Sequence, residues 1–266
     1  DGWSIEVALR ELALYYKAWV THTPPALAPL PIQYADYAAW QLQQADSAAQ
    51  RELVGWWKQK LQGAAPLLQL PTDHRRPAVQ SFRGATVAFA IDAPLTAALR
   101  ELAARSGMTL SMVLLAAYAA LLHRYTRSED LLIGIPSASR HRVELEGVLG
   151  FFINTLPLRI DLSGGPSFAE LLGRVRATAI EAYERDAAPF EQIVKELRPE
   201  RDPAYNPVVQ LGFAPQPPAE RALALPGLQA EHVEVDAQKT VFDLTLYLWE
   251  EPTRTAALFE YSTDLF

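Results

Sequence analysis

Apolar residues recur at helical spacing at the start of the chain. The first helix is predicted to open at Asp1, because the carboxylate of Asp1 or the hydroxyl of Ser4 can cap the first amide groups. The apolar positions of this helix are Ile5, Leu9, Leu12, Tyr16 and Trp19. The proline-rich run that follows, residues 21–31, cannot continue a helix and is predicted to be a stiff loop.

Helical spacing predicts six further helices, and short apolar or alternating runs predict seven strands. The helices are expected to begin near Tyr34, Asp46, Pro94, Thr109, Ser167 and Pro189, where the last two follow a capping box and a helix-starting proline. Strands are predicted over residues 86–91, 131–136, 147–159, 208–213, 228–235, 242–249 and 255–261. The order strand, helix, helix, strand over residues 86–136 indicates a layered α/β lobe.

The segment 147–159 has the most unusual pattern. If it is extended, Phe152, Leu156, Leu158 and Ile160 lie on one face and Phe151, Ile153 and Thr155 on the other. A strand that is apolar on both faces is usually buried on both. Asn154 would then need hydrogen-bond partners. Pro157 cannot donate to a ladder, so pairing should lapse on one side there.

Composition narrows the function classes. The chain has 266 residues, is 50% hydrophobic and carries a net charge of −7, and no dense lysine or arginine run suggests nucleic-acid binding. The absence of cysteine excludes disulfides, thiolate metal sites and a cysteine nucleophile. No apolar run reaches the ~18 residues of a membrane span. We therefore expect a cytoplasmic protein without a signal peptide, and the initial Asp1 in place of methionine suggests a piece of a longer protein.

Motifs for common catalytic chemistries are missing. The sequence has no G-x-S-x-G elbow, Walker A loop, G-x-G-x-x-G or H-E-x-x-H. The 5 histidines are scattered and each is expected to be a surface or structural residue. Spacing alone does not identify an enzyme.

Four motifs nevertheless occur in a recognisable order. They are Asp1-Gly-Trp-Ser4, Tyr34-Ala-Asp-Tyr-Ala-Ala-Trp40, the G-x-F-x-N-T-x-x-x-R run over residues 150–159 with a G-I-P segment before it, and Arg201-Asp-Pro-Ala-Tyr-Asn-Pro207. This set resembles the condensation domains of nonribosomal peptide synthetases. In that family the first motif reads H-H-x-x-x-D-G, so this chain starts within it, and Trp-Ser after the glycine is similar to the subtype that joins an L-configured donor to an L-configured acceptor. A further motif, [HN]-Q-D-x-P-F-E, keeps only Pro189-Phe-Glu191 here.

The resemblance implies a fold and a reaction. The fold would be α/β, with lobes similar to chloramphenicol acetyltransferase: residues 1–45 the end of the N-terminal lobe, and 46–266 the C-terminal lobe. The reaction would be peptide-bond formation between carrier-bound thioesters in secondary metabolism, including antibiotic biosynthesis. Expected partners are upstream and downstream peptidyl carrier proteins, whose phosphopantetheine arms bring the substrates, and an adjacent adenylation domain. We expect a monomer within a multidomain synthetase, with no bound cofactor, metal, nucleic acid or membrane.

The resemblance also assigns residues. Asp1 would be the structural acid of the first motif, paired with Arg140 or alternatively Arg142, and Gly2 would let the backbone pass close to the substrate tunnel. Motif-supporting positions would be Trp3, Ser4, Tyr34, Asp36, Trp40, Arg140, Asn154, Arg201, Asp202 and Asn206. The motif histidines are absent from this chain. Two alternatives stay open: a silent carrier-docking scaffold, and a non-condensing relative that epimerises or recruits a partner.

Overall fold

The computed structural model describes residues 1–200, 202–216, 223, 225–231, 233 and 237–266. The chain separates into two compact units. The first comprises Asp1–Glu52, Ser137–Asn154 and Glu220–Val235. The second comprises Leu53–Pro136, Thr155–Ala219 and Asp236–Phe266. The lobe boundary expected at residue 45 refers to the family's two lobes and stays a prediction.

The first unit is built on two helices and a loop. α1 (Gly2–Thr21) begins after Asp1, whose side chain accepts a hydrogen bond from the Ser4 amide, so the predicted cap is confirmed. α2 (Tyr34–Gln44) begins at the predicted residue, and the Asp36 side chain accepts a hydrogen bond from the Gln33 amide at 2.8 Å. The loop 137–153 contains one turn of 3₁₀ helix, η1 (Val143–Leu145).

The second unit is organised around a six-stranded mixed sheet in the order β1-β6-β5-β4-β2-β3. The strands are β1 (Gly84–Ile91), β2 (Asp130–Ser137), β3 (Asn154–Asp161), β4 (Leu211–Gln216), β5 (Leu244–Glu250) and β6 (Thr255–Ser262). β5 and β6 form the predicted antiparallel hairpin, whereas β4 runs parallel to both β2 and β5. β3 lies at an edge of the sheet, in agreement with the missing amide hydrogen of Pro157.

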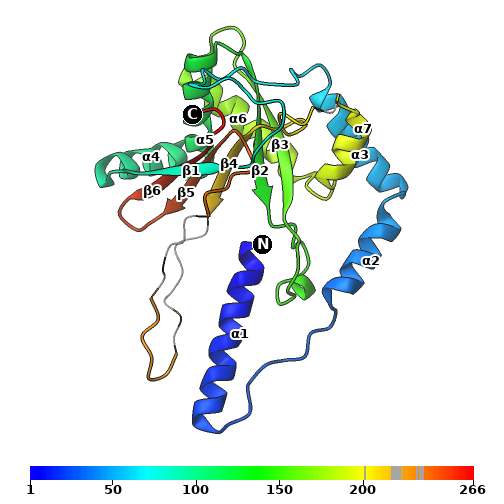
Figure 1. The fold of residues 1–266 in the computed structure, drawn as a ribbon, viewed down its shortest axis with the longest axis vertical. Helices are drawn as coiled ribbons and strands as arrows, with labels where there is room; N and C mark the ends of the chain where they lie inside the picture. The colour runs from blue at the N-terminus through cyan, green and yellow to red at the C-terminus, as the bar shows by residue number, and fades with distance from the viewer. Residues whose placement is uncertain (201, 217–222, 224, 232, 234–236) are drawn as a thin grey trace. The chain divides into compact units, whose positions relative to one another are not determined.

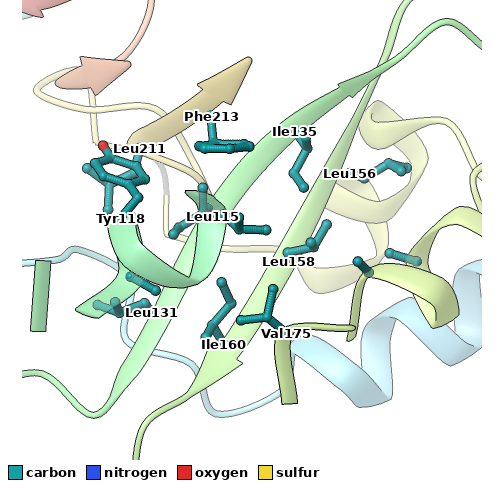
Figure 2. Close-up of a cluster of buried hydrophobic side chains, with 14 of the residues drawn as sticks. Leu115, Tyr118, Leu131, Ile135, Leu156, Leu158, Ile160, Val175, Leu211 and Phe213 are labelled. Atoms are coloured by element: carbon teal, nitrogen blue, oxygen red, sulfur yellow. The ribbon is translucent and has the colours of Figure 1, made fainter. Parts of the chain in front are cut away.

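Helices pack against this sheet to form the main core. They are α3 (Ala48–Leu61), α4 (Ala93–Arg105), α5 (Leu110–Thr126), α6 (Phe168–Tyr183) and α7 (Phe190–Leu197). α4 and α5 lie over one face of β1, β6 and β5 (Figure 1). α5 is buried along most of its length, as its nearly continuous apolar sequence predicts. Figure 2 shows Leu115 and Tyr118 of this helix against Leu131, Leu158 and Phe213 of the sheet.

Three strand predictions need correction. β3 begins only at Asn154, because the preceding residues are held in a loop, and Phe151 is 66% exposed instead of buried. Val208 has a φ of 68° and the Val209 amide bonds the Pro207 carbonyl, so this tight turn delays β4 to Leu211. Within 228–235, the described residues 228–231 and 233 form no strand, and the others lie outside the described residues.

No single helix in the described ranges is long and apolar enough to cross a membrane. α4 and α5 reach that length and composition only when joined across a bend of 106°.

Candidate functional site

Asp1 joins the start of α1 to the loop that precedes β3. Its Oδ1 accepts a hydrogen bond from the Ser4 amide at 2.8 Å, and its Oδ2 accepts one from the Phe152 amide at 2.9 Å. The side chain is only 5% exposed. A carboxylate at a helix N-terminus is also favoured by the helix dipole. Asp1 therefore fixes the distance between helix and loop through hydrogen bonds to backbone amides.

Ser4 makes a second connection between the same two segments. Its hydroxyl donates to the Gly150 carbonyl at 2.7 Å and accepts from the Gly150 amide at 3.0 Å. Arg140 Nη2 donates to the Ser4 hydroxyl oxygen at 2.9 Å. One hydroxyl thus uses its donor and both acceptor positions.

Arg140 is the buried cation of this site, with a side chain 1% exposed. Its Nη1 donates to the carbonyls of Leu145 and Val148, the latter at 2.8 Å, and its Nη2 lies 3.5 Å from Asp1 Oδ1. The guanidinium carbon also lies 4.0 Å from the ring centroid of Phe152, a cation–π geometry. Burial lowers the pKa of Arg140 from its ordinary value, while Tyr37 acts in the opposite direction. Arginine stays charged under such conditions.

Arg140, and not Arg142, is therefore the arginine that pairs with Asp1. Arg142 instead lies over the ring of Trp40, with 5.6 Å between its guanidinium carbon and the ring centroid. Carbonyl oxygens and a hydroxyl satisfy most of the Arg140 fork, and the Asp1 contact is the longest of its hydrogen bonds. Arg140 consequently stabilises the curled loop 140–148 as much as it pairs with Asp1.

An aromatic cluster closes the site from the side of α2. Tyr37 and Tyr34 contact Phe152 with ring centroids 4.7 and 5.1 Å apart, and the Tyr34 hydroxyl donates to the Phe151 carbonyl at 2.9 Å. A Cβ added at Gly150 would lie 2.1 Å from Tyr34 Cδ2, so only glycine allows this approach. We did not predict Gly150, Tyr37 or Phe152 as site residues, although each lies within a motif noted above.

The remaining motif residues of this unit have distinct positions. Trp3 Nε1 donates to the Glu146 carbonyl at 2.8 Å, which is another bond between α1 and the loop. Gly2 occupies the first helical position, and a Cβ there would contact nothing within 4 Å, so this chain itself offers no steric reason for the glycine. Asp36 completes the capping box of α2, and Asn154 begins β3. Trp40 is 45% exposed.

The last motif belongs to the second unit. Asp202 Oδ1 accepts from the Ala204 amide at 2.8 Å, and Asn206 Nδ2 donates to the Val241 carbonyl. The Asn206 carbonyl accepts from Gln210 at 2.8 Å. These bonds hold the turn before β4, which is a structural role. Arg201 lies outside the described residues.

The contacts among Asp1, Ser4 and Arg140 form a charged node in which the Ser4 hydroxyl uses its donor and both acceptor positions in hydrogen bonds. Asp1 and both terminal nitrogens of Arg140 form hydrogen bonds, whereas the buried Arg140 Nε has no partner among the described residues; the role of these bonds is to hold backbone in place. Among the described residues, no group of three histidine, aspartate or glutamate side chains could hold a metal ion.

Comparison with known proteins identifies the type of domain. The sequence matches the Condensation domain family over residues 1–266. It is 48% identical to one of the linear gramicidin synthase proteins of Brevibacillus parabrevis over 268 residues, which is 100% of this chain and 5% of that protein. It is 44% identical to the phosphinothricin tripeptide synthetase PhsC of Streptomyces viridochromogenes over 269 residues, which is 100% of this chain and 25% of that protein.

Solved structures share the fold. The X-domain from teicoplanin biosynthesis matches with a TM-score of 0.90 and 30% identity, over 100% of this chain and 62% of that one. A four-domain nonribosomal peptide synthetase bound to AMP and glycine matches with a TM-score of 0.88 and 26% identity, over 100% of this chain and 21% of that one. The expected α/β acetyltransferase-like class is confirmed. The chain spans only a small part of its curated relatives.

Proposed function

The chain belongs to the condensation-domain family, and from that premise we propose that it forms peptide bonds between a carrier-bound acyl donor and a carrier-bound aminoacyl acceptor. The match over residues 1–266 carries the proposal. The Asp1, Ser4 and Arg140 node supports it by holding the backbone of the first motif against the loop that precedes β3.

In this reaction the acceptor amine attacks the donor thioester and the thiolate leaves. The α-amine has a pKa near 8, so a useful fraction is neutral at pH 7. Holding two tethered reactants together supplies a large part of the acceleration, since effective molarities reach about 10⁵–10⁸ M in favourable geometries. The proposed role of Asp1 and Arg140 is to position the motif backbone. Substrates would arrive on phosphopantetheine arms of carrier proteins, with an adenylation domain as neighbour.

A condensation assay on the complete protein tests this proposal. Donor-loaded and acceptor-loaded carriers are mixed with the protein, and the peptide product is detected by mass spectrometry. The wild type is expected to give the elongated peptide on the acceptor carrier. Carrier binding without any product would overturn the proposal and favour the scaffold alternative or a non-condensing role in binding a partner. The X-domain from teicoplanin biosynthesis, for example, forms a complex with OxyB.

The Asp1→Ala variant tests the role assigned to the node. Removing one partner of a buried ion pair costs about 3–5 kcal/mol, so turnover and melting temperature should fall together. Asp46→Ala removes an exposed carboxylate and should change neither. Lost turnover at an unchanged melting temperature would contradict the structural role of Asp1.

A further inference from the structure

Side chains from the start of the chain hold the backbone of residues 150–152. The Ser4 hydroxyl bonds the first amide and the first carbonyl of this segment, at 3.0 and 2.7 Å. Tyr34 of α2 donates to the second carbonyl at 2.9 Å, and Asp1 accepts from the third amide at 2.9 Å. All of these residues belong to the first unit. The bonds fix the backbone of the segment and therefore the directions in which its side chains point.

These side chains differ sharply in burial. Phe152 is buried against the rings of Tyr34 and Tyr37. Its two neighbours, Phe151 and Ile153, are 66% and 38% exposed. Exposed residues on either side of a buried one are the pattern of an extended segment, whose alternate side chains face opposite sides. The sequence pattern predicts burial of both sides, so the exposed apolar side requires an explanation.

The exposed apolar side lies next to the first motif, whose charges are shielded from solvent. Consecutive Cα atoms are about 3.8 Å apart, so Phe151 directly adjoins Phe152, whose amide bonds Asp1. The Asp1 and Arg140 side chains are both buried, and the Phe152 ring covers the guanidinium group. An exposed apolar surface on a fixed backbone is typical of an interaction site. It favours a hydrocarbon group and disfavours a charged one, because a charge would lose water there without gaining a partner.

We propose that Phe151, with Ile153 beside it, contacts the apolar side chain of a carrier-bound aminoacyl substrate and so determines which side chains are accepted. The inference rests on the proposed function, because that function brings aminoacyl groups to the first motif. The donor and the acceptor can both carry such a side chain, so the shared chemistry is a hydrocarbon group next to a thioester. The node holds the backbone in place, and Phe151 supplies the specificity.

Stable amide analogues of aminoacyl-pantetheine test the proposal in the complete protein by calorimetry. The probes are leucyl and alanyl with a free amine, and acetyl-leucyl and acetyl-alanyl with the amine blocked. A leucyl group places more hydrocarbon against Phe151 than an alanyl group does, so the wild type should bind leucyl at least about tenfold more tightly in one of the two pairs. Phe151→Ser should remove most of that preference.

The blocked amine separates the two sources of the side chain. An acetylated group cannot act as acceptor, so a leucyl preference in the acetylated pair assigns the donor, and a preference confined to the free-amine pair assigns the acceptor. A wild type without any leucyl preference, or an equal preference in wild type and Phe151→Ser, overturns the proposal. Because binding is measured without turnover, the proposal can hold when the condensation assay gives no product, and it can fail in a protein that condenses.

Two further variants keep the result interpretable. Phe168→Ser makes the same change at the start of α6, where the ring is also exposed, and should keep the wild-type preference. Phe151→Trp retains an aromatic surface and adds bulk, so it should weaken leucyl binding more than alanyl binding, and it serves if Phe151→Ser does not fold. An unchanged ratio in Phe151→Trp overturns the proposal. So does a Phe151→Ser protein with a lower melting temperature and an unchanged leucyl preference, because Phe151 would then pack against the protein itself.

Discussion

At the scale of single residues, Ser4 couples three parts of the first unit. Its hydroxyl bonds both backbone groups of Gly150 and the guanidinium of Arg140, while its amide is capped by Asp1. Each of these groups is at least partly buried, and a buried polar group that loses its partner costs more than the bond contributes. The loop therefore depends on this small side chain to keep its backbone groups satisfied.

Replacing Ser4 by alanine should destabilise the protein by about 1–3 kcal/mol, because the Gly150 amide and Arg140 Nη2 lose a shared acceptor. Urea unfolding followed by tryptophan fluorescence measures the change. Thr21→Ala is the matched control, since it removes an exposed hydroxyl from the same helix and should stay within about 0.5 kcal/mol. Equal midpoints for the two variants would show that the Ser4 bonds do not hold the loop.

At the scale of elements, local signals in the sequence predicted most of the helices. The Asp1 cap, the Ser167–Glu170 capping box and the Pro189 start all depend on residues within one turn, and the structure confirms each. The strand predicted over 147–159 was partly wrong for the opposite reason. Its first half is held by contacts to Ser4 and Tyr34, more than a hundred residues away in sequence, which no periodicity reveals.

At the site, too, local motifs were predictable from the sequence and long-range contacts were not. Motif resemblance identified Asp1 and Arg140, and the choice between Arg140 and Arg142 required the geometry. The motif includes Gly150, but the sequence does not show why a glycine is needed there. The reason is the close approach of the Tyr34 ring, which belongs to α2. Glu260 has no sequence signal, because its partial burial, and the absence of a cation paired with it among the described residues, depend on how neighbouring strands align.

The close packing of α2 on the loop predicts the effect of Gly150→Ala. The new Cβ would lie 2.1 Å from Tyr34 Cδ2, so the ring or the loop must shift, and overpacking costs about 1–3 kcal/mol. Gly173→Ala is the control, because a Cβ at this position in α6 meets nothing within 4 Å and should stabilise by about 0.5–1 kcal/mol. Thermal unfolding of both variants measures these changes. A Gly150→Ala protein as stable as wild type would contradict the close packing of Gly150 against Tyr34.

At the scale of the whole molecule, the two faces of the sheet differ in what they bury. The face toward α5 is apolar and joins the main core through residues such as Leu211 and Phe213. The opposite face at β5 and β6 keeps Thr245, Tyr247 and Glu260. Stability alone favours apolar side chains at such positions. A half-buried carboxylate at this position should therefore reduce the stability of the fold.

This cost should appear in the pH dependence of folding. The folded state raises the pKa of Glu260 above its ordinary value of 4.5, so it holds the proton more tightly than the unfolded chain. Wild-type stability contributed by this group is present below pH 4.5 and is lost as pH rises through the folded pKa. Glu260→Gln does not titrate, so it should be more stable than wild type at neutral pH, with the difference closing at acid pH.

Glu170→Gln provides a comparison of opposite sign. Hydrogen bonds from the Ser167 side chain and backbone lower the pKa of Glu170, so its contribution is present at neutral pH and is lost as pH falls through the folded pKa. That variant should be less stable than wild type at pH 7. Denaturant unfolding of both variants from pH 4 to pH 8 would give curves that diverge from wild type in opposite directions as pH rises. A Glu260→Gln curve below wild type at neutral pH would mean that the carboxylate stabilises the fold, which contradicts the direction expected from its raised pKa.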